Sequence, residues 1–123
     1  MSCSCSCVND KKVKLLYSCS GASNTGHLAD QVYRKLMNTG VGSGTCLAAV
    51  GADLSGFIVS AKDSDENIII DGCSVGCGKK IFEKNSLPYT HFITTDFDVQ
   101  KGKTEITPEV ISRVTLEIQS QIG

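Results

Sequence analysis

Apolar residues along this chain occur in short runs that alternate with longer stretches of helical spacing. The first run, residues 13–17, follows a pair of lysines and is typical of a buried strand. Residues 68–70 are three consecutive isoleucines between polar neighbours and form the clearest strand in the sequence. A third strand is predicted over residues 91–97, where Phe92 and Ile93 are expected to be buried.

The segments between these strands show the three- and four-residue spacing of amphipathic helices. One helix is predicted over residues 27–38, with Gly40 ending it. A second is predicted over residues 46–62, with Thr45 as its N-cap and Asp53 capping its second half.

Two further helices complete the pattern. A short one is predicted over residues 79–84, and a closing one begins at Thr107 and Pro108, which suit the N-cap and first helical positions. Apolar residues then recur every four positions as far as Ile122. Strands alternating with helices predict a single three-layer α/β domain over residues 11–123, with a mostly parallel sheet flanked by helices.

The first ten residues have a different character. Residues 1–10 alternate Ser and Cys without a periodic apolar face, so we expect a flexible tail. In an extended chain Cys3, Cys5 and Cys7 would project to one side, about 7 Å apart. Such an arm suits a soft metal such as Cu(I) or Zn²⁺, and a tail without a role is the equal alternative.

Composition and charge exclude several classes of protein. The chain has 123 residues, 12 basic and 13 acidic, and a net charge of −1, so nucleic acid is not an expected partner. No apolar stretch approaches the roughly 18–20 residues that span a bilayer, so no membrane partner is expected. The N-terminus lacks the basic and apolar regions of a secretory signal, so we expect a cytoplasmic protein.

Cysteine content is the most informative part of the composition. The chain contains seven cysteines, an odd number that suits a closed disulfide framework poorly. In the reducing cytoplasm, cysteines indicate metal ligation or thiol chemistry more readily than disulfides. The chemistry of this protein is therefore sought at its thiols.

The loop after the first strand has the glycine spacing of a phosphate-binding loop. Gly21 and Gly26 stand where that motif has its glycines, but His27 and Leu28 replace the Lys and the Ser or Thr that contact phosphates and Mg²⁺. We therefore do not expect a nucleotide site.

Cys19 also suggests the anion-binding loop of a thiol phosphatase or arsenate reductase, which places a Cys between a strand and a helix N-terminus. That chemistry needs an Arg six residues after the Cys to clamp the anion. Position 25 is Thr25, and no Arg precedes Arg34. The sequence contains no complete catalytic constellation, so it leaves open whether the protein is an enzyme.

Four cysteines lie outside the tail: Cys19, Cys46, Cys73 and Cys77. Cys19 follows the first strand, Cys73 follows the isoleucine strand, and Cys77 comes four residues later. Cys46 opens a helix, which begins at the same edge of a parallel sheet at which the strands end. Four thiolates are the preferred ligands of a closed zinc site, so we expect all four to meet around Zn²⁺. The alternative for Cys19 and Cys46 is that they are small buried apolar side chains.

Residues 68–80, which read IIIDGCSVGCGKK, resemble the signature of the DGC-domain proteins. The resemblance covers most of residues 13–123 and includes the Cys-Ser-Gly after the first strand and the Cys-Leu-Ala that opens a helix. It departs at Ser74, where a proline is expected. The resemblance implies zinc binding through four cysteines, which correspond to Cys19, Cys46, Cys73 and Cys77, and it implies no particular reaction.

Polar residues around the cysteines have two readings each. Asp71 is expected either to accept N–H bonds from the Gly-Cys loop or to form a simple turn. His27 is expected to be a partly exposed helix residue, with an accessory ligand or a proton acceptor as the alternative, and His91 is expected to be structural. Lys79 and Lys80 either offset the charge of a zinc–thiolate cluster or are solvated surface residues.

The function expected from the sequence is that of a zinc-binding protein with no assigned protein partner. Two alternatives use the same cysteines. One is a redox or sulfur-transfer protein with Cys19 or Cys73 as the attacking thiolate, and the other is an iron–sulfur protein.

Overall fold

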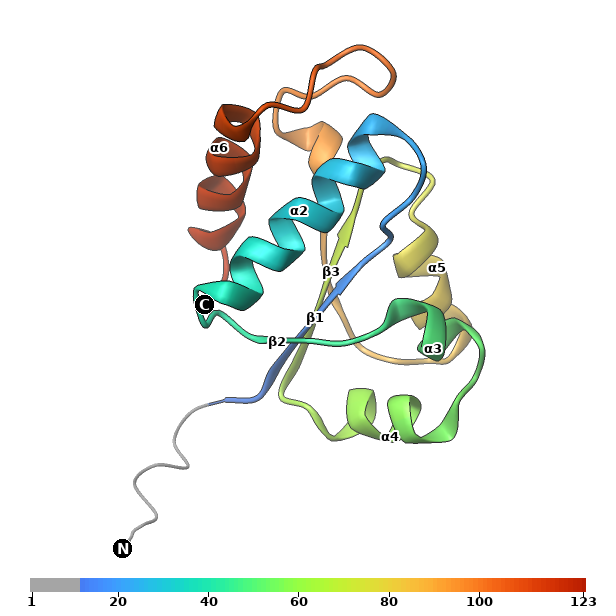
Figure 1. The fold of residues 1–123 in the computed structure, drawn as a ribbon. Coiled ribbons are helices and arrows are strands. Elements are labelled where there is room, and N and C mark those ends of the chain that lie inside the picture. Colours follow the sequence, from blue (N-terminus) through green and yellow to red (C-terminus); the bar gives the residue numbers. More distant parts are fainter. Residues whose placement is uncertain (1–11) are drawn as a thin grey trace, which may run out of the picture.

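Four parallel strands form the centre of the structure, a computed structural model that describes residues 12–123 (Figure 1). The strands are β1 (Lys14–Ser18), β2 (Ser43–Gly44), β3 (Glu66–Asp71) and β4 (Thr90–Ile93). They lie in the order β2-β1-β3-β4, and every neighbouring pair is parallel. This confirms the predicted α/β architecture. The predicted tail over residues 1–10, with Cys3, Cys5 and Cys7, lies outside the described residues.

Helices cover both faces of this sheet. They are α2 (Asn24–Asn38), α3 (Leu47–Gly51), α4 (Ser55–Asp63), α5 (Cys77–Lys84) and α6 (Pro108–Gln119). In Figure 1, α2 and α6 lie on one side of the strands, and α3, α4 and α5 lie on the other. The arrangement is the predicted three-layer domain.

Side-chain alternation along the central strands produces one apolar core on each face of the sheet. Leu16, Ile68 and Ile70 pack with the buried residues of α2 and α6. Tyr17 and Ile69 point the other way and pack with residues of α3, α4 and α5. The isoleucine strand is buried on both sides because it lies between these two helical layers.

Helix α2 begins three residues earlier than predicted. Ser23 is its N-cap, and its Oγ accepts a hydrogen bond from the Gly26 amide (3.1 Å). This cap satisfies one of the free N–H groups of the first turn, so the small residues before His27 join the helix rather than the loop. The helix ends before Gly40, as predicted, and Gly40 has a positive φ of 81°.

The caps predicted for the second helix are wrong. The Thr45 amide donates to the Leu16 carbonyl oxygen (3.0 Å) and extends the pairing between β2 and β1, so Cys46 takes the N-cap position of α3. Asp53 has a φ of 61° and lies in the turn between α3 and α4, and Leu54 precedes α4 instead. The predicted helix is therefore two short helices.

The strand predicted over residues 91–97 is shorter than expected. Strand β4 ends at Ile93, and Thr94–Asp96 form a 3₁₀ turn. Thr94 is fully buried, and its hydroxyl donates to the Gly72 carbonyl oxygen (2.8 Å), which draws the chain away from the strand direction. The start of the closing helix matches its prediction, because Thr107 caps α6 by accepting from the Val110 amide (3.2 Å). The helix ends at Gln119, before the predicted Ile122.

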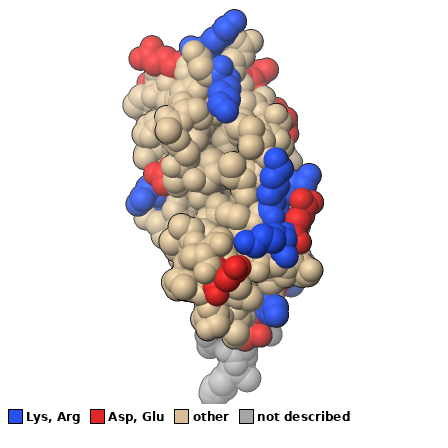
Figure 2. All heavy atoms as spheres, turned by 90° about the vertical axis from the view of Figure 1, so that its right-hand side faces the viewer, with Lys and Arg blue, Asp and Glu red and all other residues tan. Residues whose placement is uncertain are grey.

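The face of the molecule that carries α3, α4 and α5 is uncharged across its middle, with charged side chains nearer its margins (Figure 2). Leu54, Phe57 and Val59 of the α4 region are exposed. Among the helices of residues 12–123, none is long and apolar enough to cross a membrane.

Candidate functional site

The four cysteines outside residues 1–10 lie at the carboxyl edge of the sheet, as the sequence predicts. Cys19 directly follows β1, Cys46 comes two residues after β2, and Cys73 comes two residues after β3. Cys77 is the first residue of α5, which begins at this same edge. All four are free thiols; Cys46 and Cys77 are exposed, while Cys19 and Cys73 are half-buried. Parallel pairing places these separate loops side by side.

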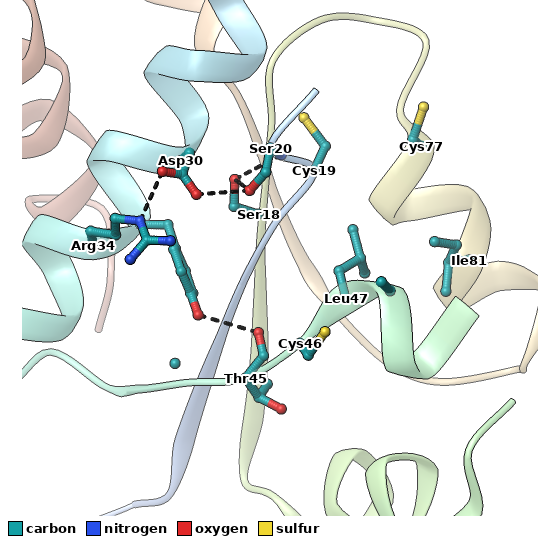
Figure 3. A pocket seen from close by; sticks show the side chains of 13 residues that line it. Ser18, Cys19, Ser20, Asp30, Arg34, Thr45, Cys46, Leu47, Cys77 and Ile81 are labelled. Carbon is teal, nitrogen blue, oxygen red and sulfur yellow. Dashed lines mark hydrogen bonds and ion pairs between the residues drawn. The ribbon is translucent and has the colours of Figure 1, made fainter. Parts of the chain in front are cut away.

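Three of the four cysteines border one open pocket of about 590 Å³. Figure 3 shows Cys19, Cys46 and Cys77 around this pocket, which lies between α2 on one side and α3 and α5 on the other. Leu47 and Ile81 supply apolar wall beside the thiols. The volume is within the range of small-molecule and cofactor sites.

The pocket does not contain a preformed metal cage. In residues 12–123, no three Cys, His, Asp or Glu side chains lie close enough together to hold a metal ion. The donors nevertheless have the right chemistry for zinc, because three cysteines line the same pocket. Binding would require the cysteine-bearing loops to approach one another. Metal ligation by Cys19, Cys46, Cys73 and Cys77 therefore stays a prediction.

Cys19 is the least solvent-exposed of the three pocket cysteines, and its surroundings shift its pKa. The Gly72 amide donates a hydrogen bond to its Sγ (3.3 Å) and ties β1 to the loop after β3. Burial raises the pKa of the Cys19 thiol, backbone N–H groups at Gly21 and Gly72 lower it, and negative charge on Asp71 and Cys77 raises it further. The net pKa lies above the ordinary thiol value, so Cys19 is poorly suited to act as a nucleophile.

Cys73 contacts a different part of the chain. Its Sγ lies 3.4 Å from the Lys101 ammonium, and it is not among the residues that line the pocket. Lys101 belongs to the loop between β4 and α6, which Asn24 anchors. The Asn24 amide group donates to the carbonyl oxygens of Gln100 (3.1 Å) and Thr104 (2.8 Å).

Asp71 holds the start of α5. Its carboxylate is almost fully buried and accepts hydrogen bonds from the amides of Gly78 (2.9 Å) and Lys79 (3.2 Å). The same carboxylate lies 2.7 Å from His91 Nε2. The first of the two readings of Asp71 is thereby confirmed: it accepts N–H bonds, and it fixes the helix that carries Cys77.

The wall of the pocket opposite α5 comes from α2. Asp30 accepts hydrogen bonds from Arg34 Nε (2.8 Å) and from the Ser20 hydroxyl (2.9 Å), as Figure 3 shows. Burial alone would raise the pKa of Asp30, but the hydrogen bonds from Arg34 and Ser20 outweigh it and hold the pKa below its ordinary value. The Tyr33 hydroxyl donates to the Thr45 carbonyl oxygen (3.3 Å) and joins α2 to the segment before Cys46.

Sequence reasoning missed several of these neighbours. The four-residue spacing of Asp30 and Arg34 is a readable signal for a pair on one helix face, whereas Lys101 is 28 residues from Cys73 and gives none. His91 was expected to be structural, and the structure adds its contact with Asp71. His27 is exposed and does not line the pocket.

Comparison with known proteins agrees with the signature around Asp71 and Cys73. The DGC domain matches residues 15–118, which include the sheet except the first residue of β1, the five helices except the last residue of α6, and the four cysteines outside residues 1–10. The chain belongs to the DGC domain family. This confirms the resemblance seen in the sequence.

A relative of this DGC-domain chain is the anaerobic and virulence modulator AnvM of Pseudomonas aeruginosa. The two are 27% identical over 93 residues, which cover 75% of this chain and 71% of the relative. No solved structure matches the chain.

Proposed function

We propose that this DGC-domain protein binds zinc through the thiols of Cys19, Cys46, Cys73 and Cys77. The observation that carries the proposal is the pocket at the carboxyl edge, which three of these thiols border. Thiolates are soft ligands that favour Zn²⁺ over hard cations such as Mg²⁺ and Ca²⁺. Bound zinc would supply a crosslink among the loops after β1, β2 and β3.

The chain's own residues prepare the ligands for this role. Asp71 fixes the first turn of α5 and therefore the position of Cys77. The Gly72 N–H points at the sulfur of Cys19, where it would stabilise a thiolate. Partners beyond the first ligands commonly orient the ligands of metal sites.

The proposal places the protein in a reducing compartment such as the cytoplasm, because oxidation of the thiols would remove the ligands. The name of the relative AnvM describes it as a modulator. By analogy, we propose a binding or regulatory role for this chain rather than catalysis of a metabolic reaction.

A second candidate function is thiol-based redox or sulfur transfer, and one contact favours it. The Lys101 ammonium beside Cys73 is the kind of cationic neighbour found at reactive thiols. Of the two nucleophiles that the sequence suggests, Cys73 is better placed than Cys19, because burial raises the pKa of the Cys19 thiol.

Metal analysis of protein purified without chelator, combined with an absorption spectrum, tests the proposal. About one zinc per chain without a visible band is the expected result for a mononuclear thiolate site. A brown protein would indicate an iron–sulfur cluster instead. Metal-free protein with rapidly alkylated thiols would favour the redox candidate.

A further inference from the structure

We infer that the pocket at the carboxyl edge binds a small organic carboxylate, with the carboxylate group on Arg34 and an apolar body against Leu47 and Ile81. All three residues line the pocket. Figure 3 shows Arg34 on one side of it and Leu47 and Ile81 on the other. The inference goes beyond the proposed zinc binding and does not depend on it, because none of these three side chains is a metal ligand in that proposal.

The first observation is which atoms of Arg34 are engaged. Its Nε donates to Asp30 Oδ2 (2.8 Å), and 59% of its side chain is exposed. Among the described residues, its two terminal Nη groups have no hydrogen-bond partner. Arg113, the other arginine of the chain, differs, because its Nη1 donates to the Phe97 carbonyl oxygen (2.9 Å) and to Glu117 (2.9 Å). Arg34 therefore presents a pair of terminal nitrogens with the fork geometry that binds carboxylates.

The second observation is that a chain of hydrogen bonds orients Arg34. Asp30 accepts from the Ser20 hydroxyl (2.9 Å) as well as from Arg34, and the Ser20 amide donates to Ser18 Oγ (3.1 Å). Ser20 has a φ of 49°, a left-handed conformation that costs free energy in a residue with a side chain. These contacts join the end of β1 to α2 and fix Asp30. The guanidinium is thereby oriented before a ligand arrives, which lowers the entropic cost of binding.

The third observation is the charge and polarity of the pocket wall. Of the described residues that line the pocket, Arg34 is the only basic one, and Asp30 offsets part of its charge. A single guanidinium shared in this way suits a singly charged carboxylate better than a doubly charged phosphate. Leu47, Ala48 and Ile81 supply apolar wall, which favours a ligand with a hydrocarbon body. The pocket volume of about 590 Å³ accommodates such a molecule.

Titration of reduced, isotope-labelled protein with hexanoate, followed through its backbone amide chemical shifts, tests the inference. Saturable shifts are expected at the amides of Leu47, Ala48 and Ile81. Hexylammonium has the same hydrocarbon tail with the opposite charge, and we expect it to bind about tenfold more weakly or worse. Absence of saturable shifts at these amides, or equal affinity for the two probes, would overturn the inference.

Two arginine variants locate the carboxylate. Arg34→Gln should weaken hexanoate binding about tenfold, because the charged bidentate contact is lost. Arg113→Gln is the matched control, since Arg113 is also paired with a carboxylate four residues away but does not line the pocket. Hexanoate that binds Arg34→Gln as tightly as the wild type, or an equal loss in both variants, would overturn the inference.

Zinc content of the same samples separates this inference from the proposed function. Zinc-free protein that binds hexanoate through Arg34 would contradict only the zinc proposal. Zinc-loaded protein that does not bind hexanoate would contradict only the carboxylate site. Hexanoate held by the metal rather than by Arg34 would keep its affinity in Arg34→Gln, and that result counts against the inference.

Discussion

At Gly72 two backbone segments approach so closely that no side chain fits between them. A Cβ at this position would lie 2.6 Å from both the Gly26 nitrogen and the Thr25 carbonyl carbon. Gly72→Ala should therefore lower the free energy of unfolding by about 2–3 kcal/mol through overpacking. Gly21→Ala is the control, because nothing lies within 4 Å of a Cβ there. Urea denaturation of both variants measures the difference, and equal stabilities would show that the contact is looser than described.

The buried carboxylate of Asp71 gives a second prediction at this scale. Asp71→Asn keeps the shape but replaces one acceptor oxygen with an NH₂ group. Because Oδ1 accepts from the Gly78 amide and Oδ2 from the Lys79 amide, this NH₂ group would face an α5 N–H in either orientation. We expect a loss of about 2–3 kcal/mol in the free energy of unfolding, because a buried donor is left opposite another donor. Asp98→Asn is the control, since Asp98 is exposed and has a positive φ that Asn tolerates. An Asp71→Asn protein as stable as the control would argue against the anchoring role.

The contacts of single residues differ in how well the sequence predicts them. For Asp71 the sequence offers acceptance of N–H bonds as one of two equal interpretations, because such bonds are local. The contact of Cys73 with Lys101 depends on a loop 28 residues away and on its attachment to Asn24. Nothing in the spacing of these residues encodes that approach.

Between elements, a buried polar network joins β1 to β3 and α4. The Tyr17 hydroxyl donates to Asn67 Oδ1 (2.9 Å), and the Asn67 amide donates to the carbonyl oxygens of Ala61 (2.9 Å) and Pro88 (3.1 Å). Ser64 also donates to Asn67 Oδ1 (3.0 Å), so this acceptor keeps one partner when Tyr17 is changed. Tyr17→Phe should therefore cost only about 1 kcal/mol at neutral pH in a urea titration.

The contribution of Tyr17 to the free energy of unfolding should change with pH in the alkaline range. Burial raises the pKa of Tyr17 to about 12, above its ordinary value of 10.0. The folded state favours the neutral phenol, so this contribution to stability is complete below pH 10 and is lost as the pH rises through about 12. Between these values wild-type stability should fall more steeply with pH than that of Tyr17→Phe. Parallel pH dependences of the two proteins would contradict the burial of this phenol.

The elements that the sequence predicts well are those with strong local signals. Three isoleucines define β3, and Thr107 with Pro108 defines the start of α6. The two-residue strand β2 is missed because it is too short for any periodicity, and it pairs only through its register with β1. The end of β4 is misplaced because the hydroxyl of buried Thr94 binds Gly72, a tertiary contact that overrides strand propensity.

At the scale of the whole molecule, parallel topology determines where the chemistry lies. Loops after three different strands, and the start of α5, meet at one edge because all four strands run in the same direction. That much follows from strand order and could be expected from the sequence. The separation of three pocket thiols from Cys73 depends on side-chain direction and on the packing of Gly72 against α2, which spacing along the chain does not specify.

Titration of metal-free, reduced protein with Co²⁺ tests the central claim of thiolate ligation most directly. Cobalt in a tetrahedral thiolate site gives visible d–d bands and a near-ultraviolet sulfur-to-metal band. We predict that both bands saturate at about one Co²⁺ per chain, that Zn²⁺ displaces them, and that the triple variant Cys19→Ser, Cys46→Ser, Cys77→Ser lacks them. Absence of the sulfur-to-metal band in the wild type, or its full retention in the triple variant, would contradict a metal site built on these thiols.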